Sequence, residues 1–229
     1  HALDQSSGLL PKAFADERFA FYGTTLNGTP QQQERWKRGV AAVDGAIGEA
    51  VGKIYVQRHF SPQTKARADE LVHNLIAAFD KRIDNLEWMT PQTRARAKAK
   101  LASLKIDMGY PSKWHDYSAL EVRADDALGN AKRASMFEYK RNLAKLGKPF
   151  EHDEFYMLPH TVNALNVPLE NRLVFPAAIL EAPFFDAAAD DAVNYGAIGS
   201  VIGHEISHSF DSSGALFDET GKMDNWWTP

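Results

Sequence analysis

The chain has 229 residues, of which 44% are hydrophobic and 11% aromatic, which is enough to bury the core of one large or two small domains. Its formal net charge of −4, with acidic and basic residues interspersed, excludes the basic surface of a nucleic-acid-binding protein. The sequence holds no apolar run of transmembrane length, and it has no cysteine, which excludes disulfides and thiolate metal ligands.

Residues 1–30 are expected to link two lobes, and residues 31–150 are predicted to form a helical region. Apolar residues recur at helical spacing from 31 to about 60, which predicts a long amphipathic helix with its apolar face in a core. Ser61-Pro62 and Thr90-Pro91 predict the starts of two more helices, because a hydroxyl caps the first turn and proline suits the first helical position.

The segment 106–114 contains Gly109 and Pro111, and is expected to be an extended or looped connection. A fourth helix is predicted from about residue 124 to residue 146, ahead of Gly147. Three lysines, Lys98, Lys100 and Lys105, are expected to lie on a helix and to form a solvated face.

Short β-compatible runs follow at 160–166 and 172–176, joined by a link rich in turn residues, so a hairpin is predicted. Pro168 and Pro176 confine these runs to sheet edges or strand ends, because proline lacks the N–H that a central strand donates. An edge strand at this point could bind an extended peptide through backbone hydrogen bonds.

The motif His204-Glu205-Ile206-Ser207-His208 lies in an apolar run, 195–210, that is predicted to be helical. Histidines four residues apart stack on one helix face, so both can bind a single zinc ion through neutral ring nitrogens. Burial of these polar side chains would be costly without a partner such as zinc. Glu205 is the candidate general base, and the pattern predicts a metallopeptidase.

A catalytic zinc site of this kind uses three protein ligands and a water, and the third ligand is open. Asp211 follows His208 by three residues on roughly the same helical face, so it is either a ligand or a group that orients a histidine. The orienting role is favoured, because three ligands from two consecutive helical turns strain tetrahedral geometry.

The sequence resembles the neprilysin-like M13 family of zinc metallopeptidases, most specifically between Val162 and Trp227 and more weakly upstream. The matching motifs are Val-Asn-Ala at 162–164, Val-Phe-Pro-Ala at 174–177, Ile179-Leu180, Pro-Phe-Phe at 183–185, Asn-Tyr-Gly at 194–196, Gly-His-Glu at 203–205, His208, Phe210-Asp211 and Trp226-Trp227. The resemblance implies a mainly α-helical, two-lobed peptidase with a small β-hairpin or sheet. Residues 151–229 would be the N-terminal part of its zincin-like catalytic lobe.

By that resemblance, Asn163 and Ala164 would bind the substrate backbone. Ile179, Phe184 and Val201 would line the apolar pocket for the residue after the scissile bond, so peptides would be cut on the amino side of bulky hydrophobic residues. The implied cofactor is one zinc ion (Zn2+), the implied partners are peptide substrates, and the implied location is extracytoplasmic, either periplasmic or secreted.

By the resemblance, the family's third zinc ligand is a glutamate in a Glu-x-x-x-Asp segment later in the chain than the HExxH motif, and no such segment follows His208 in these 229 residues. A further C-terminal segment of the same protein would then complete the site, and the chain alone would be inactive. Trp226 and Trp227 near the chain end also indicate a cut chain, because large aromatic side chains need a surface to pack against.

A departure from the family pattern lies at Leu165 and Asn166, where relatives usually carry two aromatic residues, which leaves the local substrate contacts open. The alternative function is a non-catalytic pseudo-peptidase or peptide-binding module. The intact motif argues against it, because a binding module has no need of Glu205.

Overall fold

The computed structural model describes residues 2–150 and 154–228. Contacts divide the chain into two compact units: a smaller one of residues up to 51 with 115–150, and a larger one of 52–114 with the residues from 151 onward. This grouping differs from the expected division at residues 30 and 150, because the helices of residues 62–102 belong to the larger unit. The chain is mainly helical with one small sheet, as the sequence predicts.

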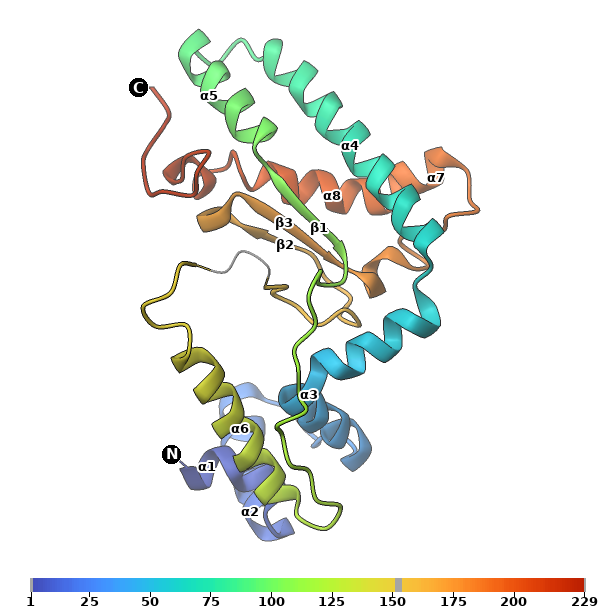
Figure 1. Cartoon of the computed structure of the whole chain (residues 1–229), viewed down its shortest axis with the longest axis vertical. Coiled ribbons are helices and arrows are strands. Elements are labelled where there is room, and N and C mark those ends of the chain that lie inside the picture. Colours follow the sequence, from blue (N-terminus) through green and yellow to red (C-terminus); the bar gives the residue numbers. More distant parts are fainter. Residues whose placement is uncertain (1, 151–153, 229) are drawn as a thin grey trace. The chain divides into compact units, whose positions relative to one another are not determined.

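The larger unit contains a three-stranded sheet in the order β1-β3-β2 (Figure 1). Its strands are β1 (Lys105–Gly109), β2 (Leu165–Val167) and β3 (Arg172–Pro176). β2 and β3 pair antiparallel across a 3-10 turn (Pro168–Glu170) and Asn171 at φ 46°, which confirms the hairpin. β2 lies at an edge, but β3 is central, since β1 pairs parallel with its other side. Pro176 is tolerated there because it is the last residue of β3.

The helices that lie wholly in the described part of the larger unit are α4 (Pro62–Asp84), α5 (Pro91–Ala102), α7 (Asp191–Gly196) and α8 (Ile198–Ser207). The last part of α3 (Arg35–His59) belongs to this unit too, and α4 packs against both α8 and β1. Both expected N-caps form: Ser61 Oγ accepts a hydrogen bond from Thr64 N at 3.0 Å, and Thr90 Oγ1 accepts one from Thr93 N at 3.2 Å. A short 3-10 turn, Ala177–Leu180, follows β3, and another, Gly214–Leu216, follows α8.

The core of the larger unit lies between these helices and the sheet, where residues such as Val72, Leu173 and Ile202 are fully buried. Complete burial of such a side chain contributes about 1.5–3 kcal/mol. Trp226 and Trp227 were expected to lack a packing surface within the chain, and this expectation is wrong, because both pack within the larger unit. Trp226 is 5% exposed, and Trp227 stacks on Trp88 with ring centroids 5.5 Å apart.

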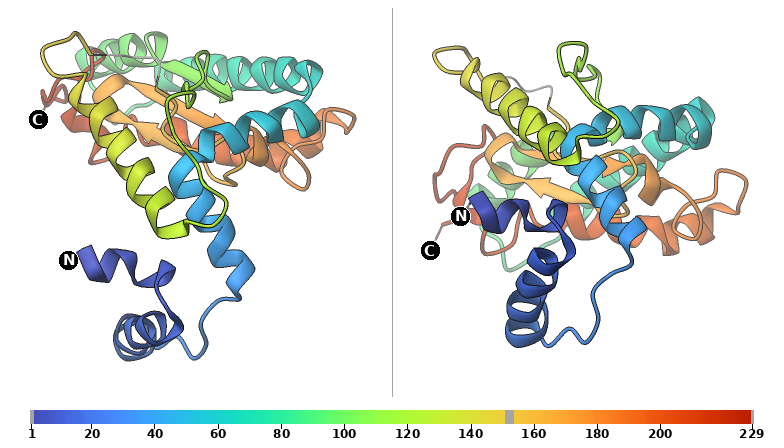
Figure 2. Two further views of the ribbon diagram at one scale, coloured as in Figure 1. Left: turned by 60° about the horizontal axis from the view of Figure 1, so that its bottom comes forward. Right: turned by 90° about the horizontal axis from the view of Figure 1, so that it is seen from below.

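The smaller unit is helical from its start, so the expected linker at residues 1–30 contains helices (Figure 2). Its elements are α1 (Ala2–Ser6), a 3-10 turn (Ser7–Leu9), α2 (Lys12–Arg18), a π-helix (Phe19–Leu26), the first part of α3 (Arg35–His59) and α6 (Ala127–Leu143). α3 confirms the predicted long helix, with a kink at Ile47. The expected burial of its apolar face is wrong for the first part of α3, where Trp36 is 64% exposed and Val40 and Val43 are exposed too. It holds near the end of α3, where Tyr55 and Val56 pack in the hydrophobic cluster of the larger unit.

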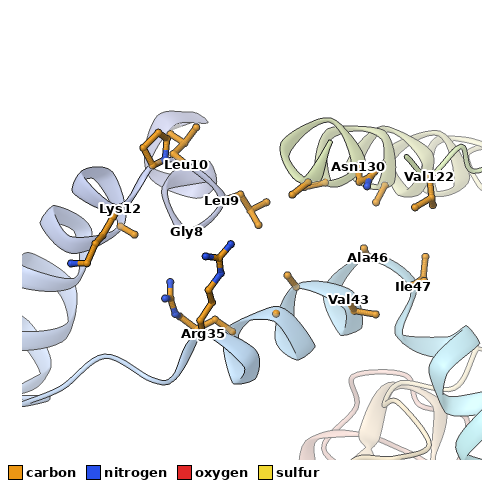
Figure 3. Close-up of a pocket in the computed structure, with 18 of the residues that line it drawn as sticks. Gly8, Leu9, Leu10, Lys12, Arg35, Val43, Ala46, Ile47, Val122 and Asn130 are labelled. Carbon is orange, nitrogen blue, oxygen red and sulfur yellow. The ribbon is translucent and has the colours of Figure 1, made fainter. Parts of the chain in front are cut away.

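An open pocket of about 790 Å³ lies within the smaller unit. Figure 3 shows Val43, Ala46 and Ile47 of α3 on one side of it, opposite Val122 and Asn130. These apolar side chains therefore face a cavity where a packed core would place other side chains. Among the described residues, no helix is long and apolar enough to cross a membrane.

Candidate active site

The HExxH motif lies at the C-terminal end of α8, which is shorter than the predicted helix of residues 195–210. A break at Ala197, with φ −93° and ψ −90°, separates α8 from α7. His204 and Glu205 occupy the last turn, and His208 directly follows the helix with αR backbone angles. His208 N still donates to His204 O at 3.2 Å, so the helical turn that brings the two histidines together is intact.

The imidazole rings of His204 and His208 meet as expected from their spacing. Their Nε2 atoms are 3.0 Å apart, with ring centroids at 4.5 Å. Two zinc–nitrogen bonds of about 2.0–2.1 Å at a tetrahedral angle place the nitrogens roughly 3.3 Å apart, so this pair fits a shared zinc ion. His204 is solvent-exposed and His208 partly so, which leaves room for further ligands.

Asp211 contacts the second histidine of the motif. Its Oδ2 lies 2.7 Å from His208 Nδ1, and its Oδ1 accepts hydrogen bonds from Ser213 N at 2.9 Å and Gly214 N at 2.8 Å. The hydrogen bond with His208 is the main cause that lowers the pKa of Asp211, and the backbone donors add to it. A carboxylate on Nδ1 favours the proton there and leaves Nε2 as the metal-binding nitrogen. This geometry favours the orienting role over the ligand role.

Glu205 is 7% exposed, in contrast with the exposed His204. Burial raises the pKa of Glu205, and the two histidines partly oppose that shift. A carboxylate with a raised pKa holds a proton more readily, which suits a group that accepts and then returns one. Among the described residues, no lysine or arginine forms an ion pair with the buried Glu205 side chain.

Asn166 on β2 is a site neighbour whose contact sequence reasoning missed. Its Nδ2 donates to Glu205 O and to Ser209 Oγ, both at 2.9 Å. Glu205 O lies in the last turn of α8, where carbonyls lack helical partners, so Asn166 satisfies one of them and connects the edge strand to the motif. The sequence marked the position only as a departure from the family pattern.

The five expected substrate-binding residues lie in two places in the larger unit. Asn163 is exposed and Ala164 is buried, directly ahead of the edge strand β2. Ile179, Phe184 and Val201 belong to the hydrophobic cluster of this unit, where Ile179 is buried and the other two are partly exposed. Phe184 also contacts the start of α8, since its carbonyl accepts a hydrogen bond from Ile198 N at 3.0 Å.

The three lysines expected on one solvated helix face have different surroundings in the structure. Lys98 is on the surface of α5 and forms ion pairs with Asp80 and Asp84. Lys105 is exposed, but it begins the strand β1, so its expected place on a helix is wrong. Lys100 is only 1% exposed, so the expectation of a solvated side chain is wrong for it.

Within residues 2–150 and 154–228, no group of three or more His, Asp and Glu side chains is arranged to hold a metal ion.

An HExxH helix packed against the edge strand of a small sheet defines a zincin-like metallopeptidase core. Models of peptidase family M13 match residues 1–111 and residues 163–229. The chain therefore belongs to peptidase family M13.

Several known proteins are similar to the chain. It is 36% identical to the neutral endopeptidase of Lactobacillus helveticus, over 90% of the chain and 32% of that protein. It is 34% identical to human neprilysin, over 96% of the chain and 30% of that protein. The solved structure of zinc metalloprotease ZMP1 of Mycobacterium tuberculosis, in complex with an inhibitor, superposes with a TM-score of 0.92 and 51% identity. The match covers 99% of the chain and 34% of ZMP1. The chain thus spans about a third of the length of these relatives.

Proposed function

We propose that the chain contributes the HExxH helix and the substrate-binding edge strand of a zinc-dependent endopeptidase or oligopeptidase. The observation that carries this proposal is the pair of Nε2 atoms of His204 and His208, 3.0 Å apart, beside the buried Glu205. Peptide hydrolysis requires a polarised carbonyl and a base for the attacking water. The bound zinc ion would supply the first as a Lewis acid.

The chain's own residues would move the proton. Glu205 would accept a proton from the attacking water and then donate it to the nitrogen of the leaving amine. Its raised pKa supports this double role, because a carboxylate with an ordinary pKa is a weaker base and is almost never protonated near neutral pH. Asp211 would hold the His208 ring in the orientation that presents Nε2 to the metal.

Zinc needs a third protein ligand in a site of this class. We assign that role to a glutamate outside these 229 residues, in a further segment of the same protein, and leave Asp211 as the orienting group. Two observations support the assignment. Both carboxylate oxygens of Asp211 already have partners, and the described residues hold no group of three ligating side chains.

Substrate specificity would come from the two groups of residues beside the motif. Asn163 and Ala164 would bind the peptide backbone as it lies along β2. Ile179, Phe184 and Val201 would receive a bulky hydrophobic residue on the carboxyl side of the scissile bond. We propose an extracytoplasmic location on the family resemblance alone.

The test uses the full-length protein and two variants. Wild type should bind about one zinc ion at this site, and His204→Ala should lose it. Glu205→Gln should keep the zinc but lose at least about 10²-fold in peptide turnover, the usual scale of a general base. Equal zinc content in wild type and His204→Ala would contradict the metal site, and full turnover by zinc-bound Glu205→Gln would show that Glu205 is not the general base. A wild-type protein that binds zinc but cleaves no peptide would favour the pseudo-peptidase or binding-module alternative.

A further inference from the structure

Lys100 on α5 is the most deeply buried cationic side chain among the described residues, with 1% of its surface exposed. Burial of an ammonium group is costly unless hydrogen bonds replace its water shell. Its partners are backbone carbonyls: Nζ donates to Gly214 O at 2.7 Å and to Phe217 O at 2.6 Å. The partners of the Lys100 ammonium group are thus backbone carbonyls of the turn that follows α8, and not an acidic side chain. By binding them, the lysine fixes this turn.

Trp226 acts on the same turn. Its indole Nε1 donates to Gly214 O at 3.2 Å, and Lys100 Nζ lies 5.5 Å from the centroid of its ring. Gly214 O therefore accepts hydrogen bonds from both side chains. A cation over an indole ring is also stabilised by the ring electrons, so the lysine and the tryptophan support each other.

The turn leads directly to the metal-binding histidine. The N–H of Gly214 points back to Asp211 Oδ1, while Asp211 Oδ2 contacts His208 Nδ1. The turn also packs tightly against the end of α8, because a Cβ on Gly214 would lie 2.1 Å from His208 O. A continuous series of hydrogen bonds thus joins the Lys100 ammonium to the His208 ring through Gly214 and Asp211.

We propose that Lys100 is a positioning residue for the zinc site, and that its ammonium group holds the turn from which Asp211 orients His208. This inference rests on the proposed function. A purely structural lysine would stabilise the fold without acting through Asp211. The two roles differ in whether the effect of losing Lys100 depends on the presence of Asp211.

The experiment is a double-mutant cycle on zinc affinity in the full-length protein. Lys100→Met removes the donors and keeps the length of the side chain. We expect it to weaken zinc binding by about 10-fold, the lower end of the effect of changing groups around a metal ligand. Asp211→Ala should weaken binding by about 10- to 100-fold, and adding Lys100→Met to it should cause no further loss. Lys98→Met, on the exposed side of the same helix, is the matched control and should bind zinc like wild type.

A second readout needs no metal. In the zinc-free protein, the amide hydrogens of Ser213 and Gly214 should exchange at least about 10-fold faster in Lys100→Met than in Lys98→Met, because the turn loses its anchor. If Lys100→Met does not fold, Trp226→Phe tests the same carbonyl, since it removes one donor and leaves the lysine in place. It should speed exchange at Gly214 and weaken zinc binding by a smaller factor.

The outcomes separate the two proposals. If wild type binds zinc through His204 but Lys100→Met binds it equally well, or loses the same factor with and without Asp211, the role of Lys100 is overturned and the proposed function stands. A Trp226→Phe protein that exchanges faster at Gly214 but binds zinc like wild type would overturn it as well, because the turn would then not act on the metal site. If wild type binds no zinc at His204 and His208, both proposals fail.

Discussion

The two units differ in how they use apolar side chains. In the larger unit, residues from α4, β3 and α8 share one core, and Val72, Leu173 and Ile202 are fully buried. In the smaller unit, the buried apolar residues among those described are Ala15 and Ala134, whereas most large apolar side chains of the unit are exposed or line the open pocket. Similar amphipathic periodicity thus produces a core in one unit and an apolar surface in the other.

The difference explains where the candidate active site lies. A metal-binding constellation requires side chains held by rigid packing, and α8 carries its histidines on the outside of the well-packed unit. Ile202 and Ile206, on the opposite face of α8, are fully buried and fix the helix against the core. The smaller unit offers no comparable support among its described residues.

The largest predicted effect tests this comparison directly. Leu173→Ala in the central strand should lower the free energy of unfolding by about 2–5 kcal/mol, because it leaves a cavity in a closed core. Trp36→Ala in the smaller unit removes a larger side chain but should change it by less than about 0.5 kcal/mol, since Trp36 is mostly exposed. Chemical denaturation measures both. Equal losses would contradict the difference between the units.

Lys100 should give the larger unit a distinctive pH dependence. Burial lowers its pKa to about 8 from an ordinary 10.5, although Asp218, Asp211 and Glu219 partly oppose the shift. The unfolded state therefore binds more protons between pH 8 and 10.5, and stability should rise with pH in that window. At about 1.4 kcal/mol per pKa unit, the rise is up to about 3 kcal/mol. It should appear in urea denaturation of the metal-free protein and be absent from Lys100→Met. Parallel pH profiles would contradict it.

Helix caps provide the smallest effect and should act alike in both units. Ser61→Ala in the larger unit and Asp126→Ala in the smaller one each remove a cap, since Asp126 Oδ1 accepts from Gly129 N at 2.8 Å. Each should cost about 1 kcal/mol, because capping depends on the first turn of a helix and not on a core. Denaturation followed by circular dichroism measures the loss. A cost confined to one unit would show that capping depends on packing here.

The sequence by itself determined what depends on residues close together in the chain. The caps at Ser61 and Thr90, the hairpin of β2 and β3, and the contact of His204 with His208 all follow from local spacing. The spacing of Asp211 also placed it near His208, but left its role open. These features are readable because the geometry of a helical turn or a tight turn is nearly the same in every protein.

The tertiary structure alone decided which segments meet. Periodicity marks an apolar face but not the surface that covers it, so Trp36 was expected in a core but is exposed. Trp226 was expected to lack a packing surface but is buried. The parallel pairing of β1 with β3 and the contact of Asn166 with Glu205 join segments far apart in the sequence. The sequence predicts the same solvated surroundings for Lys100 and its neighbour Lys98. In the folded chain, however, two backbone carbonyls lie beside the ammonium group of Lys100. A charged side chain can be buried where such partners replace water, and residues more than a hundred positions away supply them.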